Sequence, residues 1–554
     1  RPYWLYPEAP LSIARHHWAA ASVVFHFRMT AASLLNTGRL VAAEQVNATL
    51  TGSAVNTGLI YGTQGINLKS GEQIDNTNGR IGANGTIAVS GASLTNTSGD
   101  IITGVGALLV SAAGGVSNEE GVIQAAGDVT LTAASLDNEN AGKIISNAGT
   151  LNIQNIGGQA MTLIANNNGA LQAENNIVLV ANNLNNGSGA LINAVNGGLT
   201  ISAGGPTATA KINNVKGTLQ SLNDLGLTVA GLDNDGGSII ERSGTRTLLL
   251  TTGSGSAVND FSDAGGILQA AGDLKIDTTS LDGASRLVAG RNLHVTVSSD
   301  LSSDTLFQSG GDARLTVAGN YTAASGGGLS AGGNASILAS AVTNNGALMA
   351  NGGVLDVASG SAIFNTGLID GAAGVTLELP GTLTNQLGAI LSQNGSIRIG
   401  ANNNGPATAV INRSGEIAAD SADGDVRINA GSVTNDVLSG VSVANNKVLW
   451  SQNYGGSSNV NIIVPQGLLN TTTGLQGTGQ LVGHANGGTI YVEEDGGLAT
   501  LNNAASLISA GRDIDITTTG GIVNDASHIS AGRDINLSGG SLNNVGYVVQ
   551  HVFY

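Results

Sequence analysis

The stretch "SLTNTSGDIIT" (93–103) returns in altered form about every 20 residues through the first part of the chain. Each copy holds an aliphatic residue, an Asn, a turn and a second aliphatic pair. The further copies are "LLNTGRLVA" (34–42), "AVNTGLIYG" (54–62), "QIDNTNGRIGA" (73–83), "GVSNEEGVIQA" (115–125) and "SLDNENAGKII" (135–145). Their shared residues are Asn36, Asn56, Asn76, Asn96, Asn118 and Asn138, so the step is 20 residues and once 22.

This period predicts the fold. Units of about 20 residues that hold two or three short aliphatic strands, and no helix-length segment, are typical of a β-solenoid. One unit cannot bury its own apolar face, so it is stable only when it is stacked on its neighbours. Gly is abundant (83 of 554 residues) and aromatic residues make up only 3%, which suits a narrow core between closely spaced strands. We therefore expect an all-β chain, a single-stranded parallel β-helix with coils of about 20–22 residues.

The recurring Asn has two interpretations. In the first, the stacked side-chain amides hydrogen-bond to one another along the axis and form a structural turn ladder, as Asn does in cross-β stacks. In the second, Asn is only the least strained residue other than Gly for a turn with a left-handed backbone. The sequence leaves both interpretations open.

A second landmark, a Gly–Asp or Gly–Asn pair, follows the Asn motif by about ten residues. Between residues 265 and 353 it dominates the pattern, with Asp273, Asn292, Asp312 and Asn334 lying 19 to 22 residues apart. Near the end, "LISAGRDIDITT" (507–518) and "HISAGRDINLSG" (528–539) are offset by 21 residues. We expect each Arg of these two motifs to pair with the Asp of its own or of the next coil.

Composition divides the chain into four parts. Residues 1–30 hold three of the seven Pro, two of the three Trp and three of the seven His, and we interpret them as a cap over the first coil or as an artefact. Residues 31–440 and 499–554 are expected to be β-helix, the latter with a truncated end. Residues 441–498 fit the repeat least and are expected to form irregular coils.

The irregular part carries the candidate contact residues. Trp450, Tyr454 and Tyr491 lie among Gly and Ser, where exposed aromatic side chains are typical of contacts with a protein or carbohydrate partner. The alternative is that Trp450 only covers an irregular coil.

Other chemistry finds little support in the sequence. The chain has no Cys, so it has neither disulfides nor thiolate ligands, and its net charge of -17 argues against nucleic-acid binding. The near-pairs Glu119–Glu120 and Asp260/Asp263 are expected in turns, where solvated charge is the ordinary explanation. We assign no catalytic residue, no cofactor and no metal site, and expect that the protein is not an enzyme.

The units "SAGRDIDI", "AAGDVTLTAASLDN" and "LLNTGRLVA" resemble the haemagglutinin repeats of filamentous-haemagglutinin-type exoproteins. That group includes two-partner-secreted adhesins and the stalks of contact-dependent growth-inhibition effectors. The resemblance implies a right-handed β-helix, export by an outer-membrane β-barrel transporter, and a secreted or cell-surface location on a Gram-negative bacterium. It also implies virulence-related adhesion to a receptor or glycan on a host or neighbouring cell, or toxin delivery.

Two family motifs are missing, because the chain holds neither an Asn-Pro dipeptide nor a Val-Glu-Asn-Asn sequence. We therefore expect an internal segment of a larger exoprotein, a rigid extracellular filament that mediates adhesion or presents receptor-binding or toxin parts. The alternative is a β-helical polysaccharide-degrading enzyme or a phage tailspike-like glycan binder.

Overall fold

The structure is a computed structural model, and its strands build two compact units, residues 1–298 and residues 299–554. The residues that it describes are 11–13, 26–202, 211–251, 260–281, 283–400, 405–436, 447–450, 460–463, 480–483, 490–494, 497–501, 506–525 and 527–545. Within them the secondary structure is β-strand apart from one short 3-10 helix, η1 (Ile156–Gly158).

One coil shows how the chain winds. Strands β3 (Leu34–Asn36), β4 (Arg39–Ala42) and β5 (Gln45–Leu50) follow one another, and the next coil begins with β6 (Ala54–Asn56). Each strand pairs in parallel with its counterpart one coil further on, as β3 does with β6. We call the faces that contain β3, β4 and β5 the first, second and third face. The coil thus has three strands, and the predicted all-β, parallel β-solenoid is confirmed.

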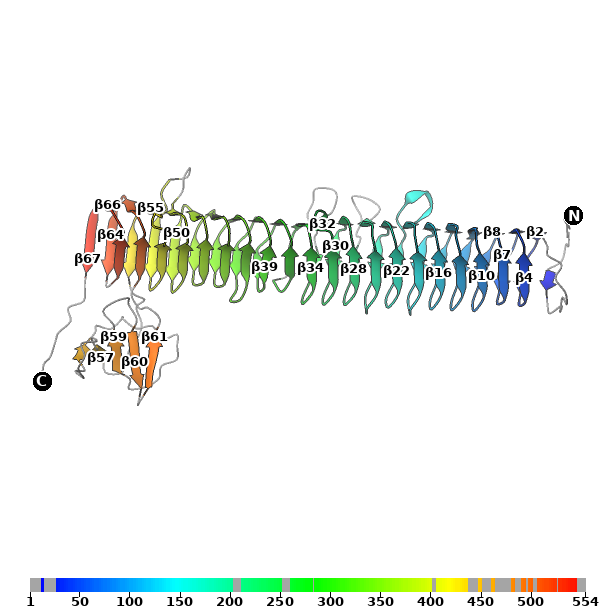
Figure 1. The fold of residues 1–554 in the computed structure, drawn as a ribbon, viewed down its shortest axis with the longest axis horizontal. Helices are drawn as coiled ribbons and strands as arrows, with labels where there is room; N and C mark the ends of the chain where they lie inside the picture. The colour runs from blue at the N-terminus through cyan, green and yellow to red at the C-terminus, as the bar shows by residue number, and fades with distance from the viewer. Residues whose placement is uncertain are drawn as a thin grey trace. The chain divides into compact units, whose positions relative to one another are not determined.

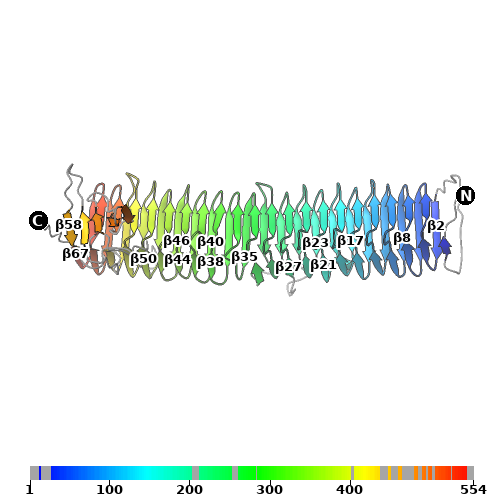
Figure 2. The same ribbon diagram turned by 90° about the horizontal axis from the view of Figure 1, so that it is seen from below.

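The first face forms one sheet in each unit (Figures 1 and 2). In unit 1 it has 12 strands: β1 (Leu11–Ile13), β3, β6, β9 (Gln73–Asp75), β12 (Ser93–Thr95), β15 (Gly115–Ser117), β18 (Ser135–Asp137), β21 (Leu163–Ala165), β24 (Asn183–Asn185), β27 (Lys211–Asn213), β30 (Gly231–Asp233) and β33 (Asp260–Ser262). In unit 2 it has nine: β38 (Leu301–Ser303), β41 (Tyr321–Ala323), β44 (Val342–Asn344), β47 (Ile363–Asn365), β50 (Thr382–Gln386), β53 (Ala409–Arg413), β56 (Val433–Asp436), β64 (Gly521–Asp525) and β67 (Ser541–Val545).

The core consists of columns of aliphatic side chains. Alternate residues of every strand point inward, and the parallel register places like residues above one another. On the second face of unit 1 one such column consists of Ile and Leu, with exposed fractions of 0–6%. It includes Ile60, Ile81, Ile101, Ile123 and Ile144. Each buried side chain contributes about 1.5–3 kcal/mol, which a single coil cannot obtain alone.

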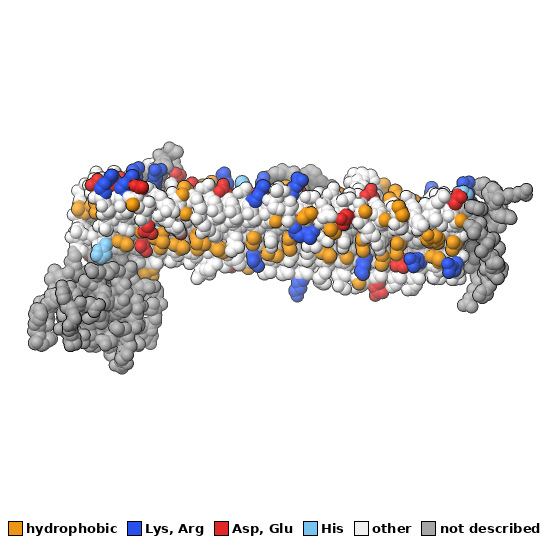
Figure 3. All heavy atoms as spheres, in the orientation of Figure 1, with side chains coloured by type: hydrophobic (Ala, Val, Ile, Leu, Met, Phe, Trp, Pro, Cys, Tyr) orange, Lys and Arg blue, Asp and Glu red, His pale blue; other side chains and the backbone are white. Residues whose placement is uncertain are grey.

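The outward side of the second face is partly apolar. Figure 3 shows hydrophobic side chains in a row over these strands in each unit, and Val41 is 45% exposed. Single exposed aliphatic residues are normal on protein surfaces, so this row by itself identifies no binding site.

The solenoid begins earlier than residue 31. Strand β2 (His26–Ala31) pairs with β5, and Met29 and Ala31 are buried in the core, while β1 pairs with β3. Strands β1 and β2 therefore extend the first coils into residues 1–30.

Residues 441–498 differ from the expected irregular coils. Strands β57 (Lys447–Trp450), β58 (Val460–Ile463), β59 (Gln480–Gly483), β60 (Ile490–Glu494) and β61 (Gly497–Leu501) form a sheet of their own. Every pairing in it is antiparallel except that of β57 with β59. Antiparallel hairpins cannot continue the winding of a parallel solenoid, which resumes only with β62 (Leu507–Ala510).

The sequence held a signal for this sheet. Glu494 pairs with Gly497, and the two residues between them are Asp495 and Gly496. An Asp-Gly pair between two strands is a strong hairpin signal.

We predict that Ile123→Ala lowers the free energy of unfolding by about 2–5 kcal/mol, because it opens a cavity between Ile101 and Ile144 in the buried column. Chemical denaturation followed by circular dichroism measures the change. Gln124→Ala, at the next and outward-facing position, serves as the control and should change stability by less than about 0.5 kcal/mol. Equal effects of the two substitutions would contradict the assignment of inward and outward faces.

Candidate functional site

The recurring Asn residues form a continuous hydrogen-bonded column inside unit 1. The Nδ2 atom of each Asn donates to the Oδ1 atom of the Asn one coil further on, at 2.6–2.8 Å. The column consists of Asn36, Asn56, Asn76, Asn96, Asn118, Asn138, Asn166, Asn186, Asn214 and Asn234, all 0–1% exposed. We call this column the Asn ladder. The arrangement is that of the first interpretation, in which stacked amides bond along the axis.

The ladder also holds the turns that follow it. Asn76 Nδ2 lies 3.2 Å from the carbonyl oxygen of Gly79 in its own turn and 3.1 Å from that of Asp100 in the next coil. Its two N–H groups and its carbonyl oxygen therefore all have partners, as a buried amide requires. Each amide thus connects two coils and one turn.

The turn needs Gly at a fixed place. A Cβ atom on Gly79 would lie 2.1 Å from the carbonyl oxygen of Asn56 and 2.6 Å from Asn76 Oδ1. The preceding residue, Asn78, has a left-handed backbone with φ of 54°. The sequence pattern Asn-x-x-Gly is therefore the consequence of amides and backbone in close contact.

Unit 2 has its own Asn ladder. The same Nδ2-to-Oδ1 bonds, at 2.7–2.8 Å, join Asn344, Asn365, Asn385, Asn412, Asn435, Asn524 and Asn544. Asn435 and Asn524 lie 89 positions apart in the sequence, yet their side chains are bonded at 2.7 Å. The ladder therefore continues directly across the separate sheet of β57–β61.

The second landmark has a related role at the start of the third face. Asp128 Oδ1 accepts a hydrogen bond from the backbone N–H of Thr150 at 2.8 Å, and Asp312 Oδ1 accepts one from that of Asn334 at 2.8 Å. Asp273 does the same for Asn292, at 3.1 Å. Each of these carboxylates ties one coil to the next at a corner, which explains why the landmark follows the coil period.

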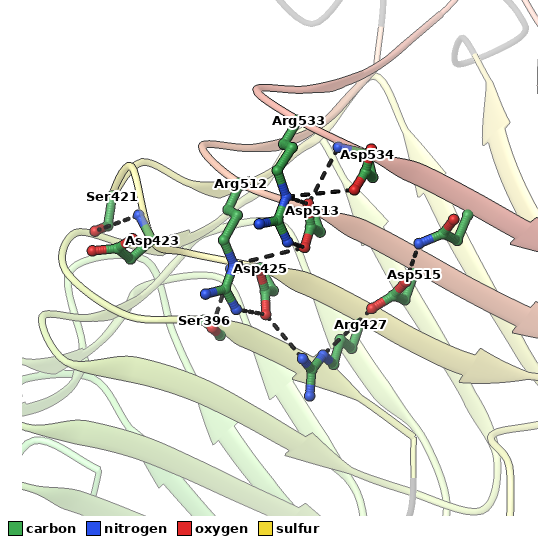
Figure 4. Close-up of polar contacts among 11 residues, drawn as sticks. Ser396, Ser421, Asp423, Asp425, Arg427, Arg512, Asp513, Asp515, Arg533 and Asp534 are labelled. Atoms are coloured by element: carbon green, nitrogen blue, oxygen red, sulfur yellow. Dashed lines mark hydrogen bonds and ion pairs between the residues drawn. The ribbon is translucent and has the colours of Figure 1, made fainter.

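Arg residues strengthen this corner in unit 2, where Arg512 and Arg533 each donate to the Asp of the preceding coil and not to that of the next one (Figure 4). Arg512 donates to both carboxylate oxygens of Asp425, and Arg533 to both oxygens of Asp513. Arg533 also lies 3.4 Å from Asp534 of its own coil. Charges of opposite sign therefore alternate along the corner, as the near-duplicate motifs predict.

Asp425 is the buried member of this network. Its side chain is 2% exposed, and besides the bonds from Arg512, at 2.5 and 2.6 Å, it accepts one from Arg427 at 3.0 Å (Figure 4). The hydrogen bonds from Arg512 lower the pKa of Asp425 below its ordinary value, although burial acts in the opposite direction. Because Arg512 follows the separate sheet in sequence and Asp425 precedes it, this ion pair holds together the two coils that flank the insertion.

Three residues close the point at which the chain leaves and rejoins the solenoid. Ser506 Oγ lies 2.6 Å from the carbonyl oxygen of Asp436, although the two residues are 70 positions apart. Arg413, in the preceding coil, donates to both carboxylate oxygens of Asp436 at 2.7 and 2.8 Å. We call Arg413, Asp436 and Ser506 the neck. Residues 437–505 thus leave and return through a single turn.

The neck takes the place of an ordinary turn. Strand β54 (Glu416–Ala419) pairs with β62 so that Glu416 lies opposite Leu507, and Ser506 therefore corresponds to Gly415 of the preceding coil. The backbone N–H of Gly415 donates to Ser506 Oγ at 3.3 Å. Ser506 is fully buried and its hydroxyl also lies 2.9 Å from the carbonyl oxygen of Asn412. Sequence reasoning missed this residue, because only the register of distant strands identifies it.

The structure describes the other predicted site residues only in part. The side chains of Trp450 and Tyr491, and all of Tyr454, lie outside the described residues. Glu119 and Glu120 lie in a turn as expected, and nearby Asp137 raises the pKa of Glu119.

Asp263 is different from the solvated charge that we expected. It is fully buried and accepts the last bond of the unit 1 ladder, from Asn234 Nδ2 at 2.6 Å. The sequence signal was its own turn, because Asp263 and Gly266 repeat the Asn-x-x-Gly spacing. No group of three potential metal ligands occurs among the described residues, and the same residues contain no helix long and apolar enough to cross a bilayer.

The family described as "Haemagglutinin repeat" matches seven overlapping segments of the chain, which together run from residue 18 to residue 386. The segments are 18–78, 70–120, 103–159, 159–205, 194–254, 250–320 and 308–386. The chain belongs to the haemagglutinin-repeat family. Comparison with curated proteins and with solved structures gives no significant match.

Membership of this family gives the chain a broad role. Haemagglutinin-repeat proteins are structural adhesins rather than enzymes, and the repeats and the solenoid fit a filament-like adhesin stalk. The family implies a secreted or cell-surface location and export by two-partner secretion, with an outer-membrane transporter as the partner.

We predict that Asn118→Ala lowers the free energy of unfolding by about 1–3 kcal/mol, because it leaves the buried Asn138 Oδ1 without its donor, whereas Asn96 Nδ2 keeps the carbonyl oxygen of Gly99. Urea denaturation measures the effect. Asn67→Ala, on an outward-facing and exposed position of β8 (Gly65–Ser70), is the control and should be nearly neutral. A neutral Asn118→Ala variant would show that the ladder adds nothing to stability.

We predict that Asp425→Asn destabilises the protein at pH 7 by about 1.5–3 kcal/mol, the range for hydrogen bonds to a charged group. Since Arg512 lowers the pKa of Asp425 in the folded state, the stabilisation is fully present above the ordinary Asp pKa, about 4, and is lost as the pH falls below it. The difference in stability between the native protein and the variant should therefore shrink below about pH 4. A difference that stays constant from pH 7 to pH 2.5 would contradict this role.

Proposed function

We propose that the chain is a stalk segment of an adhesin secreted by a Gram-negative bacterium, and that residues 437–505 are the part that contacts a partner on a host or neighbouring cell. The observation that carries this proposal is the neck, at which the chain leaves the solenoid and returns to it while the Asn ladder passes from Asn435 to Asn524 without interruption. A segment held in this way adds nothing to the stacking of the coils. Insertions on one face of a repeat protein are often its binding elements.

The stalk supports this role by keeping its winding constant. Strand registers continue across the insertion, with Val426 opposite Ile514 and Val433 opposite Ile522. The ion pairs of Arg413 with Asp436 and of Arg512 with Asp425 hold the flanking coils together. The inserted segment is thereby attached at a fixed point of a stable support.

Trp450, Tyr454 and Tyr491 are the proposed contact residues, because large aromatic side chains dominate the binding energy of many interfaces. We further propose that the partner is a cell-surface receptor or glycan. Presentation of a toxin to a neighbouring cell, as in contact-dependent inhibition, is the second role that a stalk of this family supports.

The test is a deletion of residues 437–505 that joins Asp436 to Ser506. The junction Asn435-Asp436-Ser506-Leu507 has the length of the native turn Asn56-Thr57-Gly58-Leu59, so the deleted protein should keep its far-ultraviolet circular dichroism and its thermal stability. A second variant with one added Gly at the junction reproduces the longer Asn-x-x-Gly turn. We expect binding of the fluorescently labelled protein to epithelial cells and to Gram-negative bacterial cells to fall to background.

The matched control removes a different excursion, residues 155–160. After the deletion, Met161 and Thr162 alone connect the third face to the first, as Ala181 and Asn182 do one coil further on. Met161 already forms a β-bridge with Ala181. Binding should be unchanged in this control. Full binding by a folded 437–505 deletion would show that the segment is not the contact and that the chain is a passive spacer, and failure of both deletion variants to fold would refute the separate insertion.

A further inference from the structure

The first face of unit 1 carries two adjoining hollows. One, of about 460 Å³, lies over strands β24, β27, β30 and β33, and its rim includes Asn183, Asn185, Lys211 and Asp233. The other, of about 570 Å³, lies at the turns that follow strands β18, β21, β24 and β27 and includes Asn140, Asn167, Asn168 and Lys216. Asn213 borders both hollows. We call the two together the amide groove.

The strand register explains the groove. Outward-facing Asn185, Asn213 and Asp233 lie in one row on successive strands, and Asn183 and Lys211 lie in a parallel row that stops at Gly231. Because Gly231 has no side chain, the second row leaves a depression there. The strands concerned belong to the sheet that carries the labels β21 and β27 in Figure 2. Polar side chains therefore repeat along the axis at the strand spacing of about 4.8 Å.

The charges of the groove balance. Lys211 and Asp233 bring one positive and one negative charge to the first hollow, and Lys216 and Glu139 do the same in the second. Glu139 already accepts a hydrogen bond from Asn167, so the second hollow is held together by its own polar contacts. A groove without net charge has no preference for an anionic or a cationic ligand.

The remaining chemistry is that of side-chain amides. Asn213 Oδ1 already accepts the N–H of Val215 at 3.1 Å, and Asn183 Nδ2 lies 3.4 Å from the carbonyl oxygen of Thr162. The remaining N–H and carbonyl groups of the amides match hydroxyl and acetamido groups. Peptides that bind to sheets add a strand to a free edge, but β24, β27 and β30 are each paired on both sides. The ligand must therefore be recognised through side chains alone.

We propose that the amide groove binds a neutral, linear, β-linked oligosaccharide that lies along the solenoid axis. The sugar rings of an extended β-linked chain follow one another at nearly the spacing of the coils, and because successive rings are turned over, the same hydroxyl groups meet every second amide of a row. The volumes of the two hollows lie in the range typical of small-molecule sites, about 300–1,000 Å³. This site is independent of the proposed contact segment 437–505, which belongs to unit 2.

The experiment titrates the purified full chain with chitohexaose and cellohexaose by isothermal titration calorimetry. We expect one of the two to bind, and the double variant Asn183→Ala/Asn185→Ala to weaken that binding at least ten-fold. The matched control is Gln172→Ala/Gln220→Ala, which removes two outward amides from β22 (Ala170–Ala173) and β28 (Thr218–Ser221) on the second face and should leave binding unchanged.

Three outcomes would overturn the proposal. The first is no binding of either sugar by the native chain, and the second is equal loss in the groove variant and in the control. The third is stronger binding of a heparin hexasaccharide that disappears at high salt, because this identifies an anion site instead. The 437–505 deletion variant should bind the sugar as the native chain does, so a failure of the cell-contact proposal leaves this test intact.

Discussion

A buried side-chain amide must find hydrogen-bond partners inside the protein, and the ladder Asn residues find them in the amide of the next coil and in backbone carbonyl oxygens. At the end of the unit 1 ladder Asn234 donates to Asp263 instead. The cost of one unpaired amide group, about 1–3 kcal/mol, is comparable with the burial of a whole aliphatic side chain. Each coil must therefore bring its ladder Asn to hydrogen-bonding distance of the Asn in the neighbouring coil. The Gly of the turn and the left-handed residue before it follow from this constraint, because a Cβ atom at Gly79 would collide with the amides themselves.

The same constraint explains where the chain tolerates extra residues. Asn138 and Asn166 are 28 residues apart but bond at 2.7 Å, because the additional residues leave the coil at the corner around η1. The insertion of residues 437–505 is an extreme case of the same arrangement. In both cases the coil closes beneath the excursion, and the interior columns continue as if the extra residues were absent. At the neck this closure uses charge as well as amides, since Arg413 and Arg512 each bind a carboxylate of a neighbouring coil.

An interior this uniform leaves the exterior free to vary. Inward positions carry mostly aliphatic residues and the bonded Asn, with a few buried Ser, Thr, acidic and aromatic residues such as Phe307 and Tyr321. Outward positions of the same strands carry Asn, Lys, Asp, Ser or aliphatic side chains with little effect on stacking. Neighbouring outward residues are brought together every coil, so a few substitutions in register create a row. The amide groove of unit 1 and the Arg–Asp network of unit 2 are two such rows with different chemistry, supported by the same core. A stalk built in this way carries distinct surfaces along its length at little cost to its fold.

The sequence alone determined the all-β solenoid, the coil length and the alignment of Asn36, Asn56, Asn76 and Asn96, because a 20-residue period with strand-length aliphatic segments has one stable arrangement, the stack. The Arg–Asp pairing of the last coils was equally predictable, since the motifs repeat at the coil period. The role of the Asn amides, the third strand of each coil, the burial of Asp263 and the neck at Ser506 were decided only by the tertiary structure. These features depend on which atoms meet between coils: Ser506 contacts Asp436 and Asn412 across 70 and 94 positions, and no local pattern records such a contact.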